Sequence, residues 1–209
     1  MNDSDCSTRS PETSLFCGNT VGESVLGVHI ISVQEATRLI QLGARAGLVC
    51  QLTGLEKAVT NRLYRQLNGK PSPSGLMPFT DAWYLKNNRR MLQAGLVWHL
   101  HRRLDNSGRS AARILIDVYE CYTQRVEYPL LDLTRAFVVT RLAAMKIWRE
   151  HRCEYCGTTY PAPAEITRAV CPGCRLYFRH RCRQCGSQLV SKFKGRRRAT
   201  CSHCGCALN

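Results

Sequence analysis

Paired cysteines in the last quarter of the chain constrain this sequence more than any other feature. Nine of the thirteen cysteines lie between residues 153 and 206, and eight of those nine form C-x-x-C pairs. The pairs are Cys153 with Cys156, Cys171 with Cys174, Cys182 with Cys185, and Cys201 with Cys204. Two such pairs supply four thiolates, which can surround one zinc ion in a closed tetrahedral shell. We therefore predict Zn²⁺ centres that stabilise this part of the chain, with Cys206 left over.

The spacing of the pairs indicates an internal repeat. The third pair follows the first after 29 residues, and the fourth follows the second after 30. Fourteen residues separate the first two pairs and fifteen the last two, at or just below the spacing typical of a structural Cys₄ site. We interpret the region as two metal-binding units in tandem. An interleaved pairing of the first and third pairs also fits the spacing. Disulfides, a thioredoxin-like redox pair and an iron–sulfur cluster are the competing chemistries.

Basic charge is concentrated at the same end of the chain. The net charge is +15, and residues 151–209 carry eleven Arg or Lys residues against Glu154 and Glu165. Such a distribution favours a polyanionic partner, most often nucleic acid, because neutralised phosphates release counterions. A basic surface that only keeps the protein in solution has the same composition.

The apolar segments of the chain are short. No run of about eighteen apolar residues is present, so we expect no membrane-spanning segment. The apolar stretch at residues 25–33 follows an acidic, Ser-rich start without a basic flank, which disfavours a secretory signal. We expect a cytoplasmic protein, whose thiols stay reduced and available for metal.

Apolar periodicity predicts a mainly α fold. Residues 1–28 are rich in Ser, Thr, Gly and Asn, and we interpret them as a flexible tail. From Gln34 apolar residues recur every three to four positions, so residues 29–150 are expected to form an all-α domain. Residues 151–179 and 180–209 would then be two small Cys₄ units of the zinc-ribbon type, the second of them basic.

Several helix ends are indicated by capping residues. Asp81 and Ser110 can each serve as an N-cap, because their side-chain oxygens can accept from free amides of a first helical turn. Pro129 fits the first turn of a helix that extends as far as Trp148. The apolar side chains expected to face inward from this helix are Leu130, Leu133, Phe137, Val138, Leu142, Met145 and Trp148.

Residues 42–67 can be aligned with the helix-turn-helix template. The positions that fit are Cys50, Gly54, Leu55 and Leu63, whereas Thr60 stands where Val is usual. On this alignment Lys57, Asn61 and Arg65 face outward from the second helix, where they can reach base edges or phosphates. A helical hairpin whose second helix only packs in the core would have a similar sequence.

The cysteine units contain the β-leaning segments of this end of the chain. We expect short strands at residues 166–170, 176–178 and 189–193. A basic stretch next to Phe193 combines charge with an aromatic ring, as nucleic-acid surfaces do. Its candidate DNA-binding residues are Lys192, Lys194, Arg196, Arg197 and Arg198. The alternative for this stretch is a solvated surface of a small domain.

Five motifs occur in a fixed order between Gln34 and Cys174. They are Gln34-Glu35-Ala36 leading through Leu39-Ile40-x-Leu42-Gly43-Ala44-Arg45; Arg62-Leu63-Tyr64-Arg65-x-Leu67-x-Gly69; Pro71-Ser72-Pro73-Ser74-Gly75-Leu76-Met77-Pro78-Phe79 with Trp83; Pro129-Leu130-Leu131-x-Leu133-Thr134-Arg135-Ala136; and the first two cysteine pairs. Together they resemble the FlhC family, whose members join FlhD to activate bacterial flagellar genes.

The resemblance implies a largely helical subunit with one Cys₄ zinc site, whose ligands would be the cysteines of the first two pairs. It also implies assembly with an FlhD-type subunit, binding to promoter DNA and recruitment of RNA polymerase. The sequence departs from the family pattern in its acidic N-terminal extension and in the linker at residues 157–170. It also departs after Cys174, where a second cysteine unit replaces a basic tail.

Our hypothesis from the sequence is a DNA-binding transcriptional activator subunit that acts with FlhD on flagellar promoters and contains structural zinc. The alternatives are a zinc-ribbon module for protein–protein interaction and a regulator of a non-flagellar gene set. We expect no enzyme, because a closed Cys₄ shell leaves no position for a substrate. The zinc-deaminase motif, a Ser/His/Asp set, a phosphate-binding glycine loop and paired carboxylates are not recognisable in the sequence.

Overall fold

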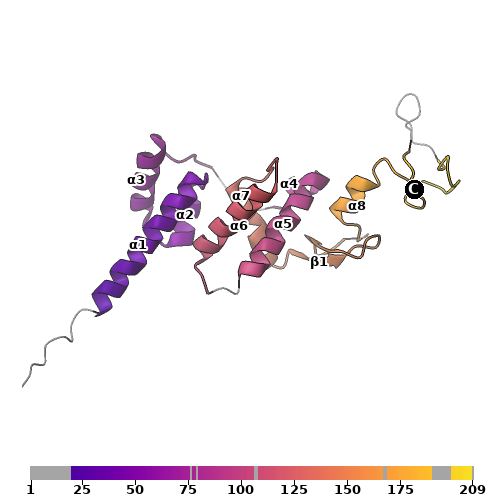
Figure 1. Cartoon of the computed structure of the whole chain (residues 1–209). Coiled ribbons are helices and arrows are strands. Elements are labelled where there is room, and N and C mark those ends of the chain that lie inside the picture. Colours follow the sequence, from indigo (N-terminus) through magenta and orange to yellow (C-terminus); the bar gives the residue numbers. More distant parts are fainter. Residues whose placement is uncertain are drawn as a thin grey trace, which may run out of the picture.

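The computed structural model describes residues 20–75, 77–78, 80–105, 108–166, 169–189 and 199–208. The elements are α1 (Thr20–Gln41), α2 (Ala46–Thr53), α3 (Lys57–Asn68), α4 (Ala82–Leu85), α5 (Asn88–Leu104), α6 (Ala111–Arg125), α7 (Leu133–Ala144), β1 (Trp148–Arg152), β2 (Thr159–Pro163) and α8 (Pro172–Tyr177). They follow one another along an elongated molecule, with α1–α3 at one end and the cysteine units at the other (Figure 1). The predicted mainly α fold class is confirmed.

One hydrophobic cluster joins α1, α2 and α3 to α6 and α7. Its larger buried members are Leu39, Ile40, Leu48, Val49, Leu55, Tyr64, Leu115, Ile116, Leu133 and Phe137. Gly54 ends α2 with a φ of 70°, a left-handed conformation that a side chain would disfavour. The turn that follows brings α3 against both α1 and α2. The three helices therefore form one packed unit on the α6–α7 pair.

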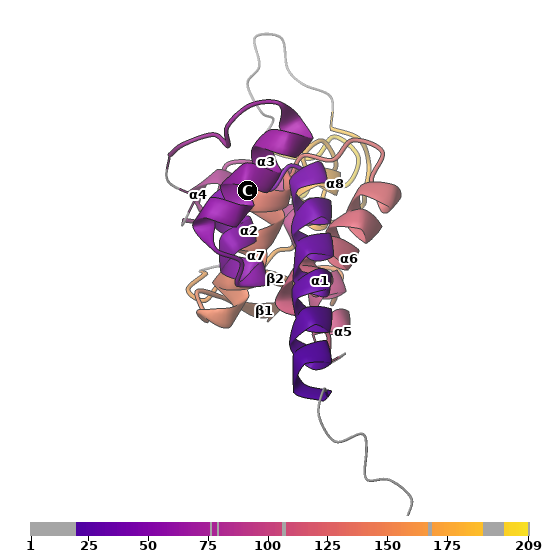
Figure 2. The ribbon, with the colours of Figure 1, turned by 90° about the vertical axis from the view of Figure 1, so that its left-hand side faces the viewer.

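The first turns of α1 project beyond the other helices (Figure 1, Figure 2). Because α1 begins at Thr20, the interpretation of residues 20–28 as part of a flexible tail is wrong. Residues 1–19 of that tail lie outside the described residues. Four large apolar side chains described in this part of α1 are 49–63% exposed; they are Leu26, Val28, Ile30 and Ile31. None of the described helices is long and apolar enough to cross a membrane.

A second hydrophobic cluster extends from α4–α7 into the first cysteine unit. It includes Tyr84, Val97, Trp98, Val118, Tyr122, Leu142, Trp148, Cys153, Tyr160 and Cys171. The hydroxyl of Tyr122 accepts from the backbone amides of Leu130 and Leu131 at 3.0 and 3.1 Å, which holds the segment between α6 and α7. Since the cluster crosses residue 150, the helices and the first unit share a core; the division of the chain at that residue stays a prediction.

The helix predicted from Pro129 to Trp148 is shorter at both ends. Asp132 is the N-cap, because its carboxylate accepts from the amide of Arg135 at 2.7 Å, so α7 begins at Leu133 and Pro129 lies before it. At the other end Lys146 has a φ of 56°, a left-handed conformation that ends helical geometry. Trp148 is buried as expected, but as the first residue of β1.

Side chains at both ends of this helix were predicted to face inward, and the structure differs. Leu130 lies in the segment before α7 and is 41% exposed. Met145 lies just after α7 and is 59% exposed. Both residues are outside the helix, so the apolar periodicity that predicted their burial does not apply to them.

Of the two predicted N-caps, Ser110 and Asp81, only Ser110 makes a capping hydrogen bond. Ser110 caps α6, accepting from the amide of Arg113 at 3.0 Å, as predicted. Asp81 precedes the short helix α4 but makes no capping hydrogen bond. Its carboxylate instead accepts from the indole Nε1 of Trp148 at 3.0 Å. The chain then turns, and Asn87 caps the longer helix α5.

The strands lie elsewhere than predicted. β1 and β2 form an antiparallel hairpin in which Trp148 pairs with Pro163 and Arg152 with Thr159. The segment predicted as a strand at residues 176–178 ends α8 instead, because Cys171 caps that helix and Pro172 occupies its first turn. The described residues of the segments at 166–170 and 189–193 contain no strand, and residues 190–193 lie outside the description.

Candidate metal centres and nucleic-acid interface

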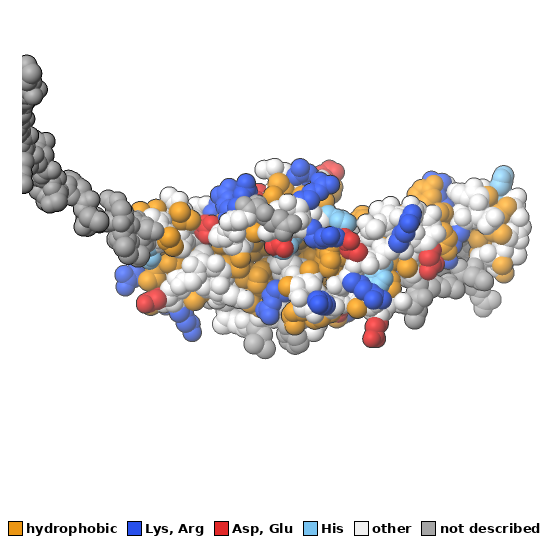
Figure 3. All heavy atoms as spheres, turned by 90° about the horizontal axis from the view of Figure 1, so that it is seen from below, with side chains coloured by type: hydrophobic (Ala, Val, Ile, Leu, Met, Phe, Trp, Pro, Cys, Tyr) orange, Lys and Arg blue, Asp and Glu red, His pale blue; other side chains and the backbone are white. Residues whose placement is uncertain are grey.

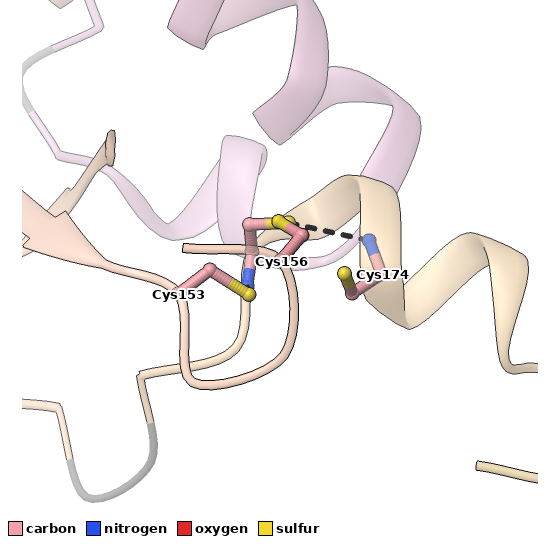
Figure 4. A group of neighbouring side chains, drawn as sticks. Cys153, Cys156 and Cys174 are labelled. Atoms are coloured by element: carbon pink, nitrogen blue, oxygen red, sulfur yellow. Dashed lines mark hydrogen bonds between the residues drawn. The ribbon is translucent and has the colours of Figure 1, made fainter. Parts of the chain in front are cut away.

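The first two cysteine pairs meet at one point, which we call the first centre. The Sγ atoms of Cys153, Cys156, Cys171 and Cys174 all lie within 4.8 Å of one another. Cys153 and Cys156 belong to the loop between β1 and β2, whereas Cys171 is the N-cap of α8 and Cys174 lies in its first turn. Figure 4 shows the side chains of Cys153, Cys156 and Cys174 turned toward a common space between loop and helix.

The backbone around the first centre explains why these sulfurs converge. The Gly157 amide donates to the Cys153 carbonyl at 3.0 Å and the Cys153 amide to the Thr158 carbonyl at 3.0 Å, which closes a tight turn. Gly157 has a φ of 70° in that turn, so a residue without a side chain is favoured there. On the other side the Cys174 amide donates to the Cys171 Sγ at 3.3 Å.

Electrostatics distinguish the sulfurs of the first centre. Burial raises the pKa of the Cys153 thiol, but hydrogen bonds from the backbone amides of Cys171, Cys156 and Tyr155 outweigh burial and lower that pKa to about 6. Burial and the neighbouring thiols raise the pKa of Cys174 above its usual value. A dication that replaces the shared protons would stabilise all four thiolates, and a closed four-sulfur shell matches the geometry that Zn²⁺ prefers.

The last two pairs form a second centre. The Sγ atoms of Cys182, Cys185, Cys201 and Cys204 also lie within 4.8 Å of one another, so the structure groups the pairs in tandem and not in the interleaved way. Both groups can hold a metal ion, and the occupancy and identity of the ion stay predictions. The pKa of the Cys182 thiol is lowered to about 6, first by the backbone amide of Cys185.

The repeat in the sequence suggested two copies of one unit, but the two units differ in structure. Both pairs of the second centre lie in tight turns closed by glycine, because Gly186 has a φ of 73° and Gly205 a φ of 72°. In the first centre only one pair lies in such a turn, and the other pair begins α8. Cys182 and Cys201 are buried within their own unit, outside the two hydrophobic clusters of the described chain. The second unit contacts the first through Arg183, whose guanidinium donates to the Tyr155 hydroxyl at 3.0 Å.

The residues predicted to contact DNA from the second helix of the hairpin lie on α3. Lys57 and Arg65 are exposed and Asn61 is half-buried, beside the buried Thr60 and Tyr64 on the helix surface. The Thr60 hydroxyl has no hydrogen-bond partner among the described residues, at the position where the template has Val. The three side chains therefore lie along one edge of the exposed side of α3, which also carries the exposed apolar residues Val59 and Leu67. DNA contact by this face stays a prediction.

The other predicted DNA-binding residues, Lys192, Lys194, Arg196, Arg197 and Arg198, lie outside the described residues. Basic side chains are nevertheless not confined to that end of the chain. The face seen from below carries Lys and Arg side chains along much of the described part, interspersed with hydrophobic ones (Figure 3).

Cys206 is a residue of the second centre that the sequence interpretation left without a role. Its Sγ lies 3.2 Å from the Sγ atoms of both Cys182 and Cys204. A signal was present in the sequence, because three of the four pairs continue as C-x-x-C-G-x and the final position is Thr158, Ser187 or Cys206. The hydroxyl residues at the first two of these positions hydrogen-bond a cysteine sulfur. The third position carries a thiol instead.

Known proteins resemble this chain over most of its length. The family model described as "Flagellar transcriptional activator (FlhC)" matches residues 23–181. A flagellar transcriptional regulator FlhC of Variovorax paradoxus is 31% identical over 160 residues, which cover 73% of this chain and 78% of that protein. Those of Xenorhabdus nematophila and Enterobacter cloacae are 28% and 29% identical, covering 68% and 70% of this chain and 78% and 80% of their own lengths. The described second centre lies beyond the family match. The chain belongs to the FlhC family of flagellar transcriptional activators.

Proposed function

We propose that this chain is the zinc-stabilised, DNA-binding subunit of an activator that, together with an FlhD-type subunit, binds flagellar promoter DNA and promotes transcription by RNA polymerase. The observation that carries the proposal is the family match across α1–α8, which includes both the α2–α3 hairpin and the first centre. The complex would act in the cytoplasm, where bacterial promoters are transcribed. The family is one of transcriptional regulators, not an enzyme class.

The metal in this proposal is structural. Four thiolates around Zn²⁺ fill a tetrahedral shell, which would tie the β1–β2 loop to α8 and leave no coordination position for a substrate. Cys153 and Cys171 already belong to the hydrophobic cluster that contains Trp98 and Trp148. Metal binding at the first centre would therefore stabilise the helical core as well as the loop.

The contact with DNA is proposed for the exposed face of α3. Lys57 and Arg65 are on the solvent side of that helix, and the net charge of +15 favours association with a polyanion. Asn61 lies between them along the same face and has the amide group suited to reading an adenine edge. α3 packs against α1 and α2, which fixes the position of this face relative to the other helices.

The partner subunit is proposed to cover the projecting turns of α1. Leu26, Val28, Ile30 and Ile31 are between 49% and 63% exposed there. A helix with large apolar residues on several sides is stable in water only when another surface covers it. An FlhD-type subunit is the partner that the family membership implies.

The test is the binding of a labelled flagellar promoter duplex, measured by fluorescence anisotropy with purified chain and FlhD-type partner over a range of salt concentrations. The double variant Lys57→Glu, Arg65→Glu is expected to weaken binding at every sequence and to lower the salt slope by about 1 for each phosphate contact removed. Arg103→Glu is the matched control, since Arg103 is exposed on α5, and it should leave binding unchanged. No salt-sensitive binding by the unchanged complex would refute the proposal.

A second candidate function is a zinc-based module for protein–protein interaction, with DNA contacted by the partner. It is favoured by the second centre, which lies beyond the family match. Size-exclusion chromatography of the same α3 variants with the partner separates the two functions. Weaker assembly with unchanged intrinsic DNA affinity would favour the interaction module.

The remaining alternative is a regulator of a non-flagellar gene set. It would be favoured if the intact complex bound promoters outside the flagellar set and did not bind flagellar promoters.

A further inference from the structure

The second centre contains five sulfurs, one more than a tetrahedral metal shell uses. Cys206 is the additional one, and its Sγ lies 3.2 Å from the Sγ atoms of Cys182 and Cys204. These distances are shorter than the 3.7 Å between Cys182 and Cys204 and between Cys185 and Cys201. Cys206 is therefore the thiol in closest contact with two predicted metal ligands.

The turn that carries Cys206 repeats the turns that carry Thr158 and Ser187. In each, the glycine amide donates to the first cysteine carbonyl, at 3.0, 3.0 and 2.9 Å. The first cysteine amide donates in turn to the carbonyl of Thr158, Ser187 or Cys206, at 3.0, 2.8 and 2.8 Å. Because the backbone is the same, the three side chains occupy equivalent places beside a cysteine sulfur. A hydroxyl at this place can only donate or accept a hydrogen bond, whereas a thiol can also be oxidised.

We propose that Cys206 is a resolving thiol, which makes the second centre a site of reversible oxidation by hydroperoxides. The inference rests on metal binding by the second centre as proposed above. On oxidation Cys206 would form a disulfide with a neighbouring ligand, and the loss of that ligand would release the metal. The first centre has Thr158 at the equivalent place and would keep its metal.

The reaction balances with hydrogen peroxide as the oxidant. The Cys204 sulfur, on an exposed residue, attacks one peroxide oxygen; the O–O bond breaks, and the other oxygen leaves as water after taking up a proton. The sulfenic acid formed on Cys204 is then attacked by the Cys206 sulfur. The S–S bond forms, the S–O bond breaks, and the hydroxyl leaves as a second water with the Cys206 proton. Two thiols are oxidised and one peroxide is reduced.

The burial of the ligands supports a difference in sensitivity to oxidation between the two centres. Cys153 and Cys171 of the first centre belong to the hydrophobic cluster around Trp98 and Trp148, so loss of the metal there would disturb the core. The second centre shares no such cluster with the described helices. Cys156 and Cys185 are exposed alike, but Cys204 is exposed where the equivalent Cys174 of the first centre is half-buried. Oxidant can therefore reach its ligands, and the unit can open without unfolding the remainder.

The experiment compares the full-length zinc-loaded chain with the variants Cys206→Ser and Cys206→Thr, which restore the hydroxyls found at Ser187 and Thr158. Metal content is measured first, and both variants are expected to bind as much zinc as the unchanged chain. Zinc release on addition of hydrogen peroxide is then followed with a chromogenic chelator. Without the resolving thiol the intramolecular step is lost, so release from the second centre should slow by roughly tenfold or more.

Peptide mapping by mass spectrometry gives a readout independent of metal release. After oxidation the unchanged chain should contain a disulfide that joins Cys206 to Cys204 or Cys182, and reduction should restore zinc binding. Equal release rates in all three proteins, a disulfide that omits Cys206, or weaker zinc binding by both variants before oxidation would each overturn the proposal. If the unchanged chain binds only one zinc ion, the second centre does not bind metal and the proposed metal release is refuted. Peptide mapping of the oxidised chain then still tests whether Cys206 forms the disulfide.

Discussion

A contact between Asp81 and Trp148 ties two distant parts of the chain together. The Trp148 side chain is 1% exposed, and its Nε1 donates to the Asp81 carboxylate at 3.0 Å. Its ring also packs edge-on against Tyr84 at 5.5 Å between ring centroids. Trp148 is the first residue of β1, the strand that leads into the first centre. The position of the metal ligands therefore depends on this contact.

Asp81→Ala should destabilise the protein by about 1–3 kcal/mol, because it leaves a buried indole N–H without an acceptor. Asp81→Asn keeps an acceptor oxygen and should lower the free energy of unfolding by a smaller amount. Urea unfolding followed by tryptophan fluorescence measures both variants. Equal losses in the two variants would mean that the hydrogen bond is not the source of the stability.

At the scale of elements, the start of α7 is set by one side chain and its end by the backbone conformation of one residue. Asp132 satisfies the amide of Arg135, and Lys146 ends the helical geometry before β1. The hairpin β1–β2 and helix α8 then carry the four cysteines of the first centre. The length of α7 thus sets where the chain enters the metal site.

Asp132→Ala should lower the free energy of unfolding by about 1 kcal/mol through loss of the N-cap, whereas Asp132→Asn should retain most of the stability. Pro129→Ala is the second comparison. Since Pro129 lies before the helix, its replacement should change stability by less than about 0.5 kcal/mol. Thermal unfolding followed by circular dichroism is the measurement, and a larger effect at Pro129 than at Asp132 would contradict the observed helix start.

The cysteine centres were predictable from the sequence, and the strands were not. The turn at Cys153 and Cys156 depends on residues close in sequence, so local spacing is sufficient to predict it. β1 begins at Trp148, whose indole bonds to Asp81, 67 residues earlier, and no local pattern records that contact. Apolar periodicity continued through Trp148 and predicted a helix. The hairpin partner Thr159–Pro163 contains two prolines, which disfavour a strand in any sequence-based prediction.

At the scale of the whole molecule, the two centres are joined to the helical body in different ways. The first shares a hydrophobic cluster with α5–α7. The second contacts the first unit through Arg183 and Tyr155, where the guanidinium also lies 5.4 Å from the ring centroid. The body and the first centre should therefore unfold together, and the second unit separately.

A chain that ends after Arg179 tests this arrangement. With both centres metallated, metal analysis should give two zinc ions for the full chain and one for the shortened chain, because the pairs combine in tandem. The thermal midpoint of the helical signal should be unchanged, since the removed residues share no core with the helices. In the full chain Cys171→Ser should instead remove the zinc ion of the first centre and lower that midpoint, because Cys171 is 8% exposed within the core cluster. Loss of both ions on shortening would mean that the pairs combine across the two units.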